Sequence, residues 1–418
     1  MVCKKIDKYS GKATTYLHPT DGKGATHIHS IMEYAPHQLL IGSDDGLLLF
    51  NTITEEYQLF TEDETNPHSL SNRFVYPIIK DHEGGIWIGT YYGGVNYISP
   101  NTGQFESFVH SRFSNSVNGT VIGRFCEDSN GDVWIASDDG GLNRFSPKNR
   151  KFSHYLPLEG KNSLSYHNVH ALCMDDDNLW IGTYTGGVNV LNLQTGTFKT
   201  YSAYQDNPAS LDGTSSYAIF QRQKSREYGS TSMSGVNLYN REKDNFTRIK
   251  YLDALTIDID QDTKGNLWFS TQGKGLFKYH PEKQIWKNYI HDHKNPNSLA
   301  NNQVNCVLID TNGEMWVGTM NGLCKYNAEE DAFETLPLEI PSHNICSIIE
   351  DQRILWLTTT KGLVRYTPGE GCRVFTKSDG LQSEQFLPNA ALKASDGKIY
   401  IGSVNGFNAF YPIRLRQM

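Results

Sequence analysis

Apolar and polar positions alternate along this chain in a pattern that recurs every 40 to 48 residues. Each repeat begins with a short apolar run such as "VNCVLID" (Val304–Asp310), followed by a turn such as "DTNGE". A segment of the "LWIGT" type comes next, then a glycine turn and two further short segments, the last more polar. Alternation with a period of two, bounded by Gly, Asn and Asp, is typical of half-buried β-strands. The pattern therefore predicts four short antiparallel strands per repeat.

Six of the seven tryptophans fall at one position of this repeat, in its second predicted strand. A repeat of about 45 residues is typical of the blades of a β-propeller. A lone four-stranded sheet cannot cover its own faces, so each blade needs neighbours on both sides. We therefore predict an all-β propeller in which this side chain fills the space between adjacent blades. The nine repeats place the following residues at the position: Leu40, Trp87, Trp134, Trp180, Tyr228, Trp268, Trp316, Trp356 and Tyr400.

The last repeat lacks a fourth strand, because only "IRLRQM" follows Tyr411 and Pro412. An earlier segment must supply that strand if the ring is to close. Lys12–Leu17 ("KATTYL") would close a single ring of nine blades, and Gln104–Val109 ("QFESFV") would close a ring of the last seven repeats. The strand pattern alone leaves both alternatives open, together with a ring of eight blades.

Composition and charge narrow the class of partner. The 418 residues carry a net charge of −8 without any basic run, so the phosphate neutralisation that nucleic acid requires is missing. No stretch approaches 18 consecutive apolar residues, and the N-terminus has no apolar segment of a secretory signal. The seven cysteines form no CxxC pair and are odd in number, so we expect small buried thiols and no disulfide framework.

The usual catalytic and metal motifs are missing from the sequence. "DSNGD" and its relatives resemble half of a calcium loop, but the glutamate at position 12 and the flanking helices of an EF-hand are absent. No HExxH or G-x-S-x-G motif occurs, and the acidic pairs fall in predicted turns. We expect no cofactor and no metal, although sequence alone does not exclude a pair of glycosidase carboxylates across the channel.

Residues just before or at the start of each inner strand are expected to ring one mouth of the central channel. They are rich in aromatic, amide and imidazole side chains, which can stack on sugar faces and bond hydroxyl groups. The predicted ligand-binding residues are Arg73, Tyr76, Arg124, Tyr166, His167, His170, Tyr217, Asn302, Asn305, His343, Asn344, Gln385, Phe386 and Asn389, with Asn72 beside them.

Three motifs together resemble the two-component regulator propeller repeat. They are "EDSNGDVWIASDDGGLNRF", the "NPNSLANNQV" linker (Asn295–Val304) and the ending Gly380–Pro412, and the resemblance covers nearly the whole chain. The resemblance implies the periplasmic sensor region of a Bacteroides-type hybrid histidine kinase, with paired seven-bladed propellers. On that basis we predict a partial propeller over 1–103, a seven-bladed propeller over 104–412 and a tail over 413–418. The chain is then expected to be a fragment or a truncated product.

The resemblance implies a non-enzymatic sensor that recognises an oligosaccharide or another small ligand and relays the signal to a histidine kinase outside this chain. A homodimer is expected in the full-length context. Two other functions remain open from the sequence: a propeller enzyme acting on polysaccharide, such as a glycoside hydrolase or lyase, and a platform that binds protein. We favour the sensor, because no group of acid, base and orienting residues is seen to break the repeat in one place.

Overall fold

The computed structural model describes residues 3–16, 27–63, 69–82, 84–100, 103–112, 114–221, 228–232, 235–249, 252 and 254–415. The chain divides into two compact units, an N-terminal unit of Met1–Thr102 with Ser111–Ser114 and a C-terminal unit of Gly103–His110 with Asn115–Met418. Nearly all regular structure is β-strand, as the sequence pattern predicts. None of the helices in the described residues is long and apolar enough to cross a membrane.

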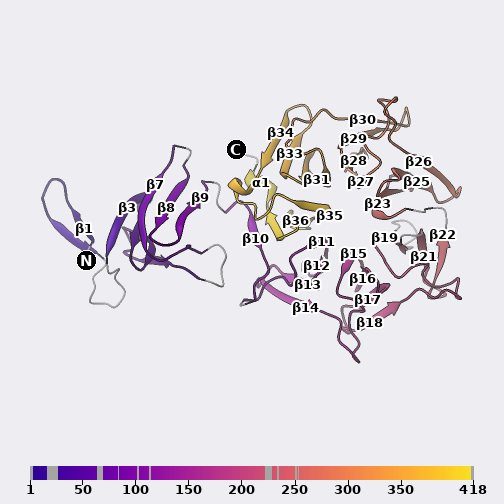
Figure 1. Cartoon of the computed structure of the whole chain (residues 1–418), viewed down its shortest axis with the longest axis horizontal. Helices are drawn as coiled ribbons and strands as arrows, with labels where there is room; N and C mark the ends of the chain where they lie inside the picture. The colour runs from indigo at the N-terminus through magenta and orange to yellow at the C-terminus, as the bar shows by residue number, and fades with distance from the viewer. Residues whose placement is uncertain are drawn as a thin grey trace. The chain divides into compact units, whose positions relative to one another are not determined.

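Among the described residues, the C-terminal unit forms seven four-stranded antiparallel sheets arranged as a ring of blades (Figure 1). Blades 1 to 3 are β11 (Ile122–Glu127), β12 (Val133–Ser137), β13 (Gly141–Ser146) and β14 (Lys151–Tyr155); β15 (Val169–Asp175), β16 (Asn178–Thr183), β17 (Val188–Asn192) and β18 (Phe198–Tyr201); and β19 (Ala218–Gln221), β20 (Tyr228–Thr231), β21 (Val236–Asn240) and β22 (Asn245–Ile249). Blades 4 and 5 are β23 (Thr256–Gln261), β24 (Leu267–Thr271), β25 (Leu276–His280) and β26 (Ile285–Tyr289); and β27 (Val304–Ile309), β28 (Met315–Thr319), β29 (Gly322–Asn327) and β30 (Ala332–Thr335). Blades 6 and 7 are β31 (Ile345–Asp351), β32 (Ile354–Thr359), β33 (Gly362–Thr367) and β34 (Gly371–Phe375); and β35 (Phe386–Lys393), β36 (Ile399–Ser403) and β37 (Gly406–Phe410), with β10 (Glu106–Phe108) as the fourth strand.

Strand β10 completes blade 7 from the N-terminal side of the unit. It pairs antiparallel with β37, with Glu106 opposite Ala409 and Phe108 opposite Phe407. Each inner strand contacts the inner strand of the next blade, and β35 contacts β11, so the contacts run fully around the ring. The strand therefore lies in the Gln104–Val109 segment, one of the two donors considered from the sequence.

In the C-terminal unit, the aromatic side chains of the second strands lie between blades, which confirms their predicted role there. Trp134 of blade 1 is 1% exposed and belongs to one apolar cluster with Val169, Leu179 and Ile181 of blade 2. Trp180, Trp268, Trp316 and Trp356 are also buried, each in a cluster with residues of the following blade. Tyr400 of blade 7 packs in the same way with residues of blade 1.

The described residues of the N-terminal unit form three sheets. They are the hairpin β1 (Cys3–Ile6) and β2 (Ala13–Tyr16); the four strands β3 (Ile28–Ala35), β4 (Gln38–Ser43), β5 (Gly46–Asn51) and β6 (Tyr57–Phe60); and the three strands β7 (Val75–Lys80), β8 (Ile86–Thr90) and β9 (Gly94–Ile98). Strand β2 pairs with β1, so the expectation that Lys12–Leu17 could close a ring is wrong for its described residues. The local turn explains this pairing, because Asp7 caps it by accepting hydrogen bonds from the Tyr9 and Ser10 N–H groups.

Two short helical segments complete the C-terminal unit, η2 (Lys377–Asp379) and α1 (Pro412–Leu415). The predicted tail over 413–418 thus begins inside α1. The Leu415 side chain is fully buried, and its carbonyl accepts a hydrogen bond of 2.8 Å from Arg365. Residues 416–418 lie outside the described residues.

Candidate functional site

One end of the ring, called the entry face here, is where the chain enters each inner strand. A backbone hydrogen bond that recurs among the blades marks this end. In it, the N–H of the residue after the second strand donates to the carbonyl of the residue before the inner strand. Examples are Asp138 N to Val121 O and Tyr184 N to Asn168 O, both 3.0 Å. The bond recurs in blades 4, 5 and 7. In five of the seven blades, two positions are thus held together at the mouth of the channel, although only one of them was predicted from the sequence.

A β-bulge at the start of the inner strand directs side chains toward this mouth. In blade 2 the pairing with β16 shifts between Val169 and Ala171, so His170 lies outside the ladder. Asn305 in blade 5 occupies the same position, and Asn389 in blade 7 lies within a wider irregularity between Phe386 and Ala391. A bulged residue has no partner opposite it, which leaves its side chain free to point away from the sheet.

Three side chains form a cross-channel bridge, defined as Arg124, Asp258 and Asn389. Arg124 of blade 1 donates to Pro388 O of blade 7 at 2.8 Å and to Ile257 O of blade 4. Asn389 of blade 7 donates to the Asp258 carboxylate of blade 4. Inner strands are edge strands with unpaired backbone groups, and these side chains satisfy some of them. The bridge therefore joins blades on opposite sides of the ring.

Burial shifts the pKa values of the two ionisable residues of the bridge, Asp258 and Arg124. Burial raises the pKa of Asp258 to about 6, although the hydrogen bond from Val307 N and the charge of Arg124 oppose the shift. Burial also lowers the pKa of Arg124, which the carboxylates of Asp258 and Asp138 oppose. Arg124 makes no ion pair within 4.0 Å with any residue of the described ranges. Its terminal nitrogens are directed to backbone carbonyl groups instead.

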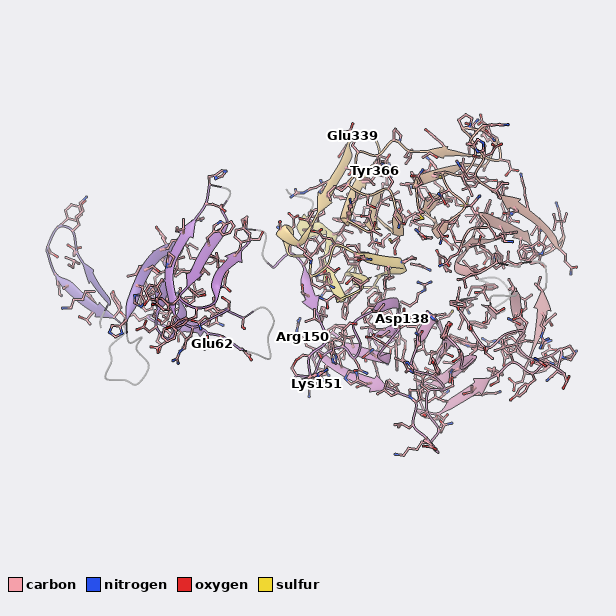
Figure 2. The ribbon with its side chains drawn as sticks, viewed as in Figure 1. Glu62, Asp138, Arg150, Lys151, Glu339 and Tyr366 are labelled. Atoms are coloured by element: carbon pink, nitrogen blue, oxygen red, sulfur yellow. The ribbon has the colours of Figure 1, made fainter. Side chains whose placement is uncertain are left out.

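Beside the bridge, four side chains of blades 1 to 3 form what we call the mouth cluster: Asp138, His170, Tyr184 and Tyr217. His170 Nδ1 lies 3.5 Å from Asp138 Oδ1, and the His170 ring lies 5.0 Å from the Tyr217 ring and 5.9 Å from the Tyr184 ring, between centroids. Tyr184 is 46% exposed. Figure 2 shows Asp138 at the inner side of the ring. The cluster combines open aromatic faces with a carboxylate.

The structure brings some of the predicted residues together and separates others. Arg124, His170, Tyr217 and Asn389 meet at the channel, and Tyr166 and His167 form a ring pair at 4.6 Å just before β15. Arg73 and Tyr76 belong to the N-terminal unit, where Tyr76 stacks on His29 with centroids 4.0 Å apart. Gln385 is exposed beside the last inner strand.

Other predicted residues have structural partners. The buried Asn305 amide donates to Asn344 Oδ1 at 2.7 Å and to Ile345 O at 2.8 Å. Asn302 accepts a hydrogen bond from His291 N, and His343 Nε2 lies 3.1 Å from Leu338 O. Phe386 was placed at the mouth in error: it is 1% exposed and packs in the core of blades 6 and 7. The wide irregularity after it moves the mouth position of blade 7 to the residues around Asn389.

Sequence reasoning missed Asp138, Tyr184 and Asp258. Asp138 and Tyr184 directly follow the "WIAS" and "WIGT" segments, so the residue after the second strand in every repeat was an available signal. Asp258 lies in "TIDIDQ", where acidic residues replace the apolar residues usual in an inner strand. An acid at a strand position that is normally apolar was therefore also a readable signal.

The turns that resemble calcium loops use their carboxylates internally. Asp128 Oδ1 accepts hydrogen bonds from Asn130 N and Asp132 N, and Oδ2 accepts one from Trp134 Nε1 at 2.9 Å. These bonds give the turn a structural role. Among the described residues, no group of three or more His, Cys, Asp or Glu side chains is placed to hold a metal ion.

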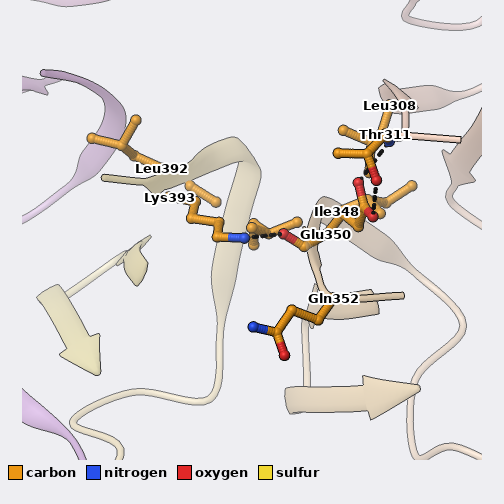
Figure 3. A pocket seen from close by; sticks show the side chains of 9 residues that line it. Leu308, Thr311, Ile348, Glu350, Gln352, Leu392 and Lys393 are labelled. Atoms are coloured by element: carbon orange, nitrogen blue, oxygen red, sulfur yellow. Dashed lines mark hydrogen bonds between the residues drawn. The ribbon is translucent and has the colours of Figure 1, made fainter. Parts of the chain in front are cut away.

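A cavity of about 580 Å³ lies among blades 5, 6 and 7 near the Asp–Gly turns (Figure 3). Its polar groups bond one another, with Lys393 Nζ donating to Glu350 O at 3.1 Å and Thr311 N to the Glu350 carboxylate at 2.8 Å. The lining residues are Leu308, Thr311, Ile348, Ile349, Glu350, Gln352, Ala391, Leu392 and Lys393. The mouth cluster, which leaves acceptor groups open, is the better candidate for ligand binding.

Comparisons with known proteins agree with the fold. A family model described as "Two component regulator propeller" matches residues 69–92, 116–139, 163–185 and 298–321. A curated histidine kinase of Formosa agariphila is 25% identical over 315 residues, which cover 60% of this chain and 22% of that protein. A solved extracellular domain of a hybrid two-component system from B. thetaiotaomicron has a TM-score of 0.71 at 22% identity, over 99% of this chain and 59% of that one.

A solved streptogramin B lyase has a TM-score of 0.57 at 12% identity, over 73% of this chain and 96% of that chain. At this identity the likeness extends to the fold alone. The chain spans about a fifth of the curated relative and about three fifths of the solved extracellular domain. The third and fourth matched stretches, 163–185 and 298–321, contain the inner strands of blades 2 and 5 with their bulged residues His170 and Asn305.

Proposed function

Because this chain carries two-component regulator propeller repeats, we propose that it is a ligand-sensing region of a two-component signalling protein whose histidine kinase lies outside this sequence. We also propose that this sensing region lies outside the cytoplasm, in the periplasm or at the cell exterior. The likeness to solved extracellular domains supports this location. The observation that carries the site is the mouth cluster, where the exposed Tyr184 ring lies with the His170 and Tyr217 rings and the Asp138 carboxylate.

The ligand is proposed to be a carbohydrate that binds at the mouth cluster. Tyr184 and Tyr217 offer ring faces on which a sugar can stack, and Asp138 offers an acceptor for its hydroxyl groups. The cross-channel bridge lies beside them and limits how deeply a ligand can enter. Ligand binding would signal by favouring one arrangement of a dimer, and it can shift that equilibrium only through its differential affinity for the two states.

Calorimetric titration with a panel of plant and host oligosaccharides tests this proposal. We expect saturable binding of one glycan class, and a loss of at least tenfold in affinity for Tyr184→Ala and Tyr217→Ala. Tyr204→Ala is the matched control, because Tyr204 is 61% exposed in the linker between blades 2 and 3. Binding that is equal in all three variants would place the ligand elsewhere. Cleavage products in the titrated sample would support the alternative of an enzyme, and recovery of a protein partner without any sugar binding would support a protein platform.

A further inference from the structure

Among the described residues, the one polar contact of the Asp138 carboxylate within the mouth cluster is with His170 Nδ1, 3.5 Å from Oδ1. Its neighbour Asp139 is different, since it accepts from Ser137 Oγ at 2.8 Å and from Thr120 N and Val121 N. The Asp138 side chain is 37% exposed. The two adjacent acids therefore differ: Asp139 holds the loop, whereas Asp138 Oδ2 accepts no hydrogen bond from the described residues and can accept one from a ligand.

His170 does not neutralise this carboxylate. Burial and the nearby Arg124 charge lower the pKa of His170 to about 4, so the imidazole is neutral at pH 7. Nε2 is buried and has no hydrogen-bond partner in the described part of the chain. A proton costs less on Nδ1, which faces Asp138 Oδ1 at 3.5 Å, than on the unpartnered Nε2, so the ring gives Oδ1 only a long and weak contact. The ring therefore forms an uncharged wall of the cluster.

Arg124 is the cation whose charge acts on both Asp138 and His170, and its two terminal nitrogens already make three hydrogen bonds. Its Nη1 group bonds Gly123 O at 2.9 Å and Pro388 O at 2.8 Å, and its Nη2 group bonds Ile257 O. A guanidinium that binds an acidic ligand presents two parallel N–H groups to it, and here these nitrogens are held by backbone carbonyl groups of three blades. An acidic ligand beside Asp138 would therefore meet a carboxylate without a free guanidinium to offset its charge.

We propose that Asp138 is the residue that sets ligand specificity at the mouth: it accepts a hydrogen bond from a hydroxyl or ammonium group of a saccharide and repels a carboxylate or sulfate. The sensor then responds to neutral or amino saccharides and not to acidic ones. This inference rests on the proposed carbohydrate-sensing function. Two like charges at contact distance repel strongly where water is partly excluded, so the selectivity against acidic saccharides is expected to be large.

The test compares oligosaccharides of matched length by calorimetry at pH 7 and 0.15 M salt. The neutral and amino set comprises xylo-, galacto- and chito-oligosaccharides with their deacetylated amino forms. The acidic set comprises galacturonate, glucuronate-bearing and sulfated oligosaccharides. Binding is expected in the first set only. Asp138→Asn should weaken the best neutral or amino ligand at least tenfold, about 1.4 kcal/mol, and should raise the affinity for acidic saccharides relative to that ligand.

Asp177→Asn is the matched control, because Asp177 is an exposed acid in the turn between β15 and β16. Its affinities should equal those of the unmodified chain, and melting temperatures verify that both variants fold. If an acidic oligosaccharide binds as tightly as the best neutral one, the inference about Asp138 is wrong while the sensor function stands. An unchanged affinity in Asp138→Asn has the same consequence. If no saccharide of either set binds, the carbohydrate function and the inference both fail.

Discussion

A single tryptophan position of the repeat has two different environments in this protein. Trp134 and Trp87 each stand six residues after a turn aspartate, and each indole N–H donates to it, at 2.9 Å to Asp128 and 2.8 Å to Asp81. Trp134 is 1% exposed, whereas Trp87 is 46% exposed. The difference arises because blade 2 covers the indole of Trp134. The sequence position alone therefore does not give the energetic contribution of the side chain.

Alanine variants of Trp134 and Trp87 distinguish two contributions to stability: packing between blades and the hydrogen bond to the turn aspartate. Trp134→Ala should lower the free energy of unfolding of the C-terminal unit by about 3–5 kcal/mol, because it leaves a cavity between two blades. Trp87→Ala should cost the N-terminal unit about 1 kcal/mol or less, because the indole is already half in water. Calorimetry that resolves the thermal transitions measures both. Equal losses in the two variants would contradict the packing role.

His170 gives the mouth cluster a pH dependence. In the unfolded chain a histidine titrates near pH 6.5, and burial beside Arg124 lowers the pKa of His170 to about 4 in the folded protein. Between these values the unfolded state binds more protons, so stability falls as the pH falls from 6.5 to 4, by at most about 3 kcal/mol. Nuclear magnetic resonance should find the ring midpoint near 4. His170→Gln should lose less stability over this range than His167→Gln, and a midpoint at or above 6.5 would overturn the argument.

At the scale of the strand pair, the length of the turn decides where its aspartate bonds. Asp128, Asp262 and Asp310 stand six residues before a tryptophan and accept its indole N–H. Asp175 and Asp351 stand five residues before Trp180 and Trp356, whose buried indole nitrogens have no partner among the described residues. Asp175 instead pairs with Arg241 of blade 3 at 2.6 Å, and Asp351 with Lys393 of blade 7 at 3.0 Å. In the shorter turns, the aspartate therefore forms an ion pair with the next blade instead of a hydrogen bond with the tryptophan of its own blade.

Asp310 allows the turn to be tested in blade 5. Its carboxylate accepts from Asn312 N, Glu314 N and Trp316 Nε1 at 2.8–3.0 Å. Asp310→Ala leaves these donors without an acceptor and should destabilise the C-terminal unit by about 2–4 kcal/mol. Asp310→Asn keeps one acceptor oxygen and should lose about half as much. Urea denaturation, followed by tryptophan fluorescence, measures the stability of both variants. An alanine variant as stable as the unmodified chain would mean that backbone contacts alone stabilise the turn.

Local signals were sufficient to predict the strands, the turns and the tryptophan packing, because each depends on residues within one repeat. The mouth was predicted only in part. Arg124 and Asp258 are 134 residues apart and meet only because opposite blades face one channel, which no local pattern encodes. A one-residue bulge recurs at the same position of β11, β15, β23, β27 and β31, whereas blade 7 has a wider irregularity between Phe386 and Ala391. The partners of the side chains at these positions differ from blade to blade, and the repeat alignment does not reveal them.

At the scale of the whole C-terminal unit, the ring depends on three residues of β10. Phe108 stacks on Phe407 with centroids 4.5 Å apart and packs against Phe145 of blade 1. Glu106 pairs with Arg150 of blade 1 at 2.8 Å and with the buried Lys398 of blade 7. Gly406 has φ of 81°, and a Cβ atom there would lie 2.1 Å from Phe108 O, so glycine is required where β10 meets β37. One strand thereby joins the first and last blades through its backbone, two rings and an ion pair.

Two shortened chains test this dependence directly. A chain of residues 103–418 keeps β10 and should melt at the temperature of the C-terminal unit in the whole chain. A chain of residues 111–418 lacks only β10 and its flanking residues, but it leaves the buried edge of β37 unpaired and exposes the apolar contacts of Phe407. It should melt at least 10 °C lower or aggregate, because ring closure protects both the first and the last blade. The double variant Glu106→Gln with Phe108→Ala, made in residues 103–418, separates closure from chain length and should fall between the two. Identical melting of the two shortened chains would mean that the ring holds together without its closing strand.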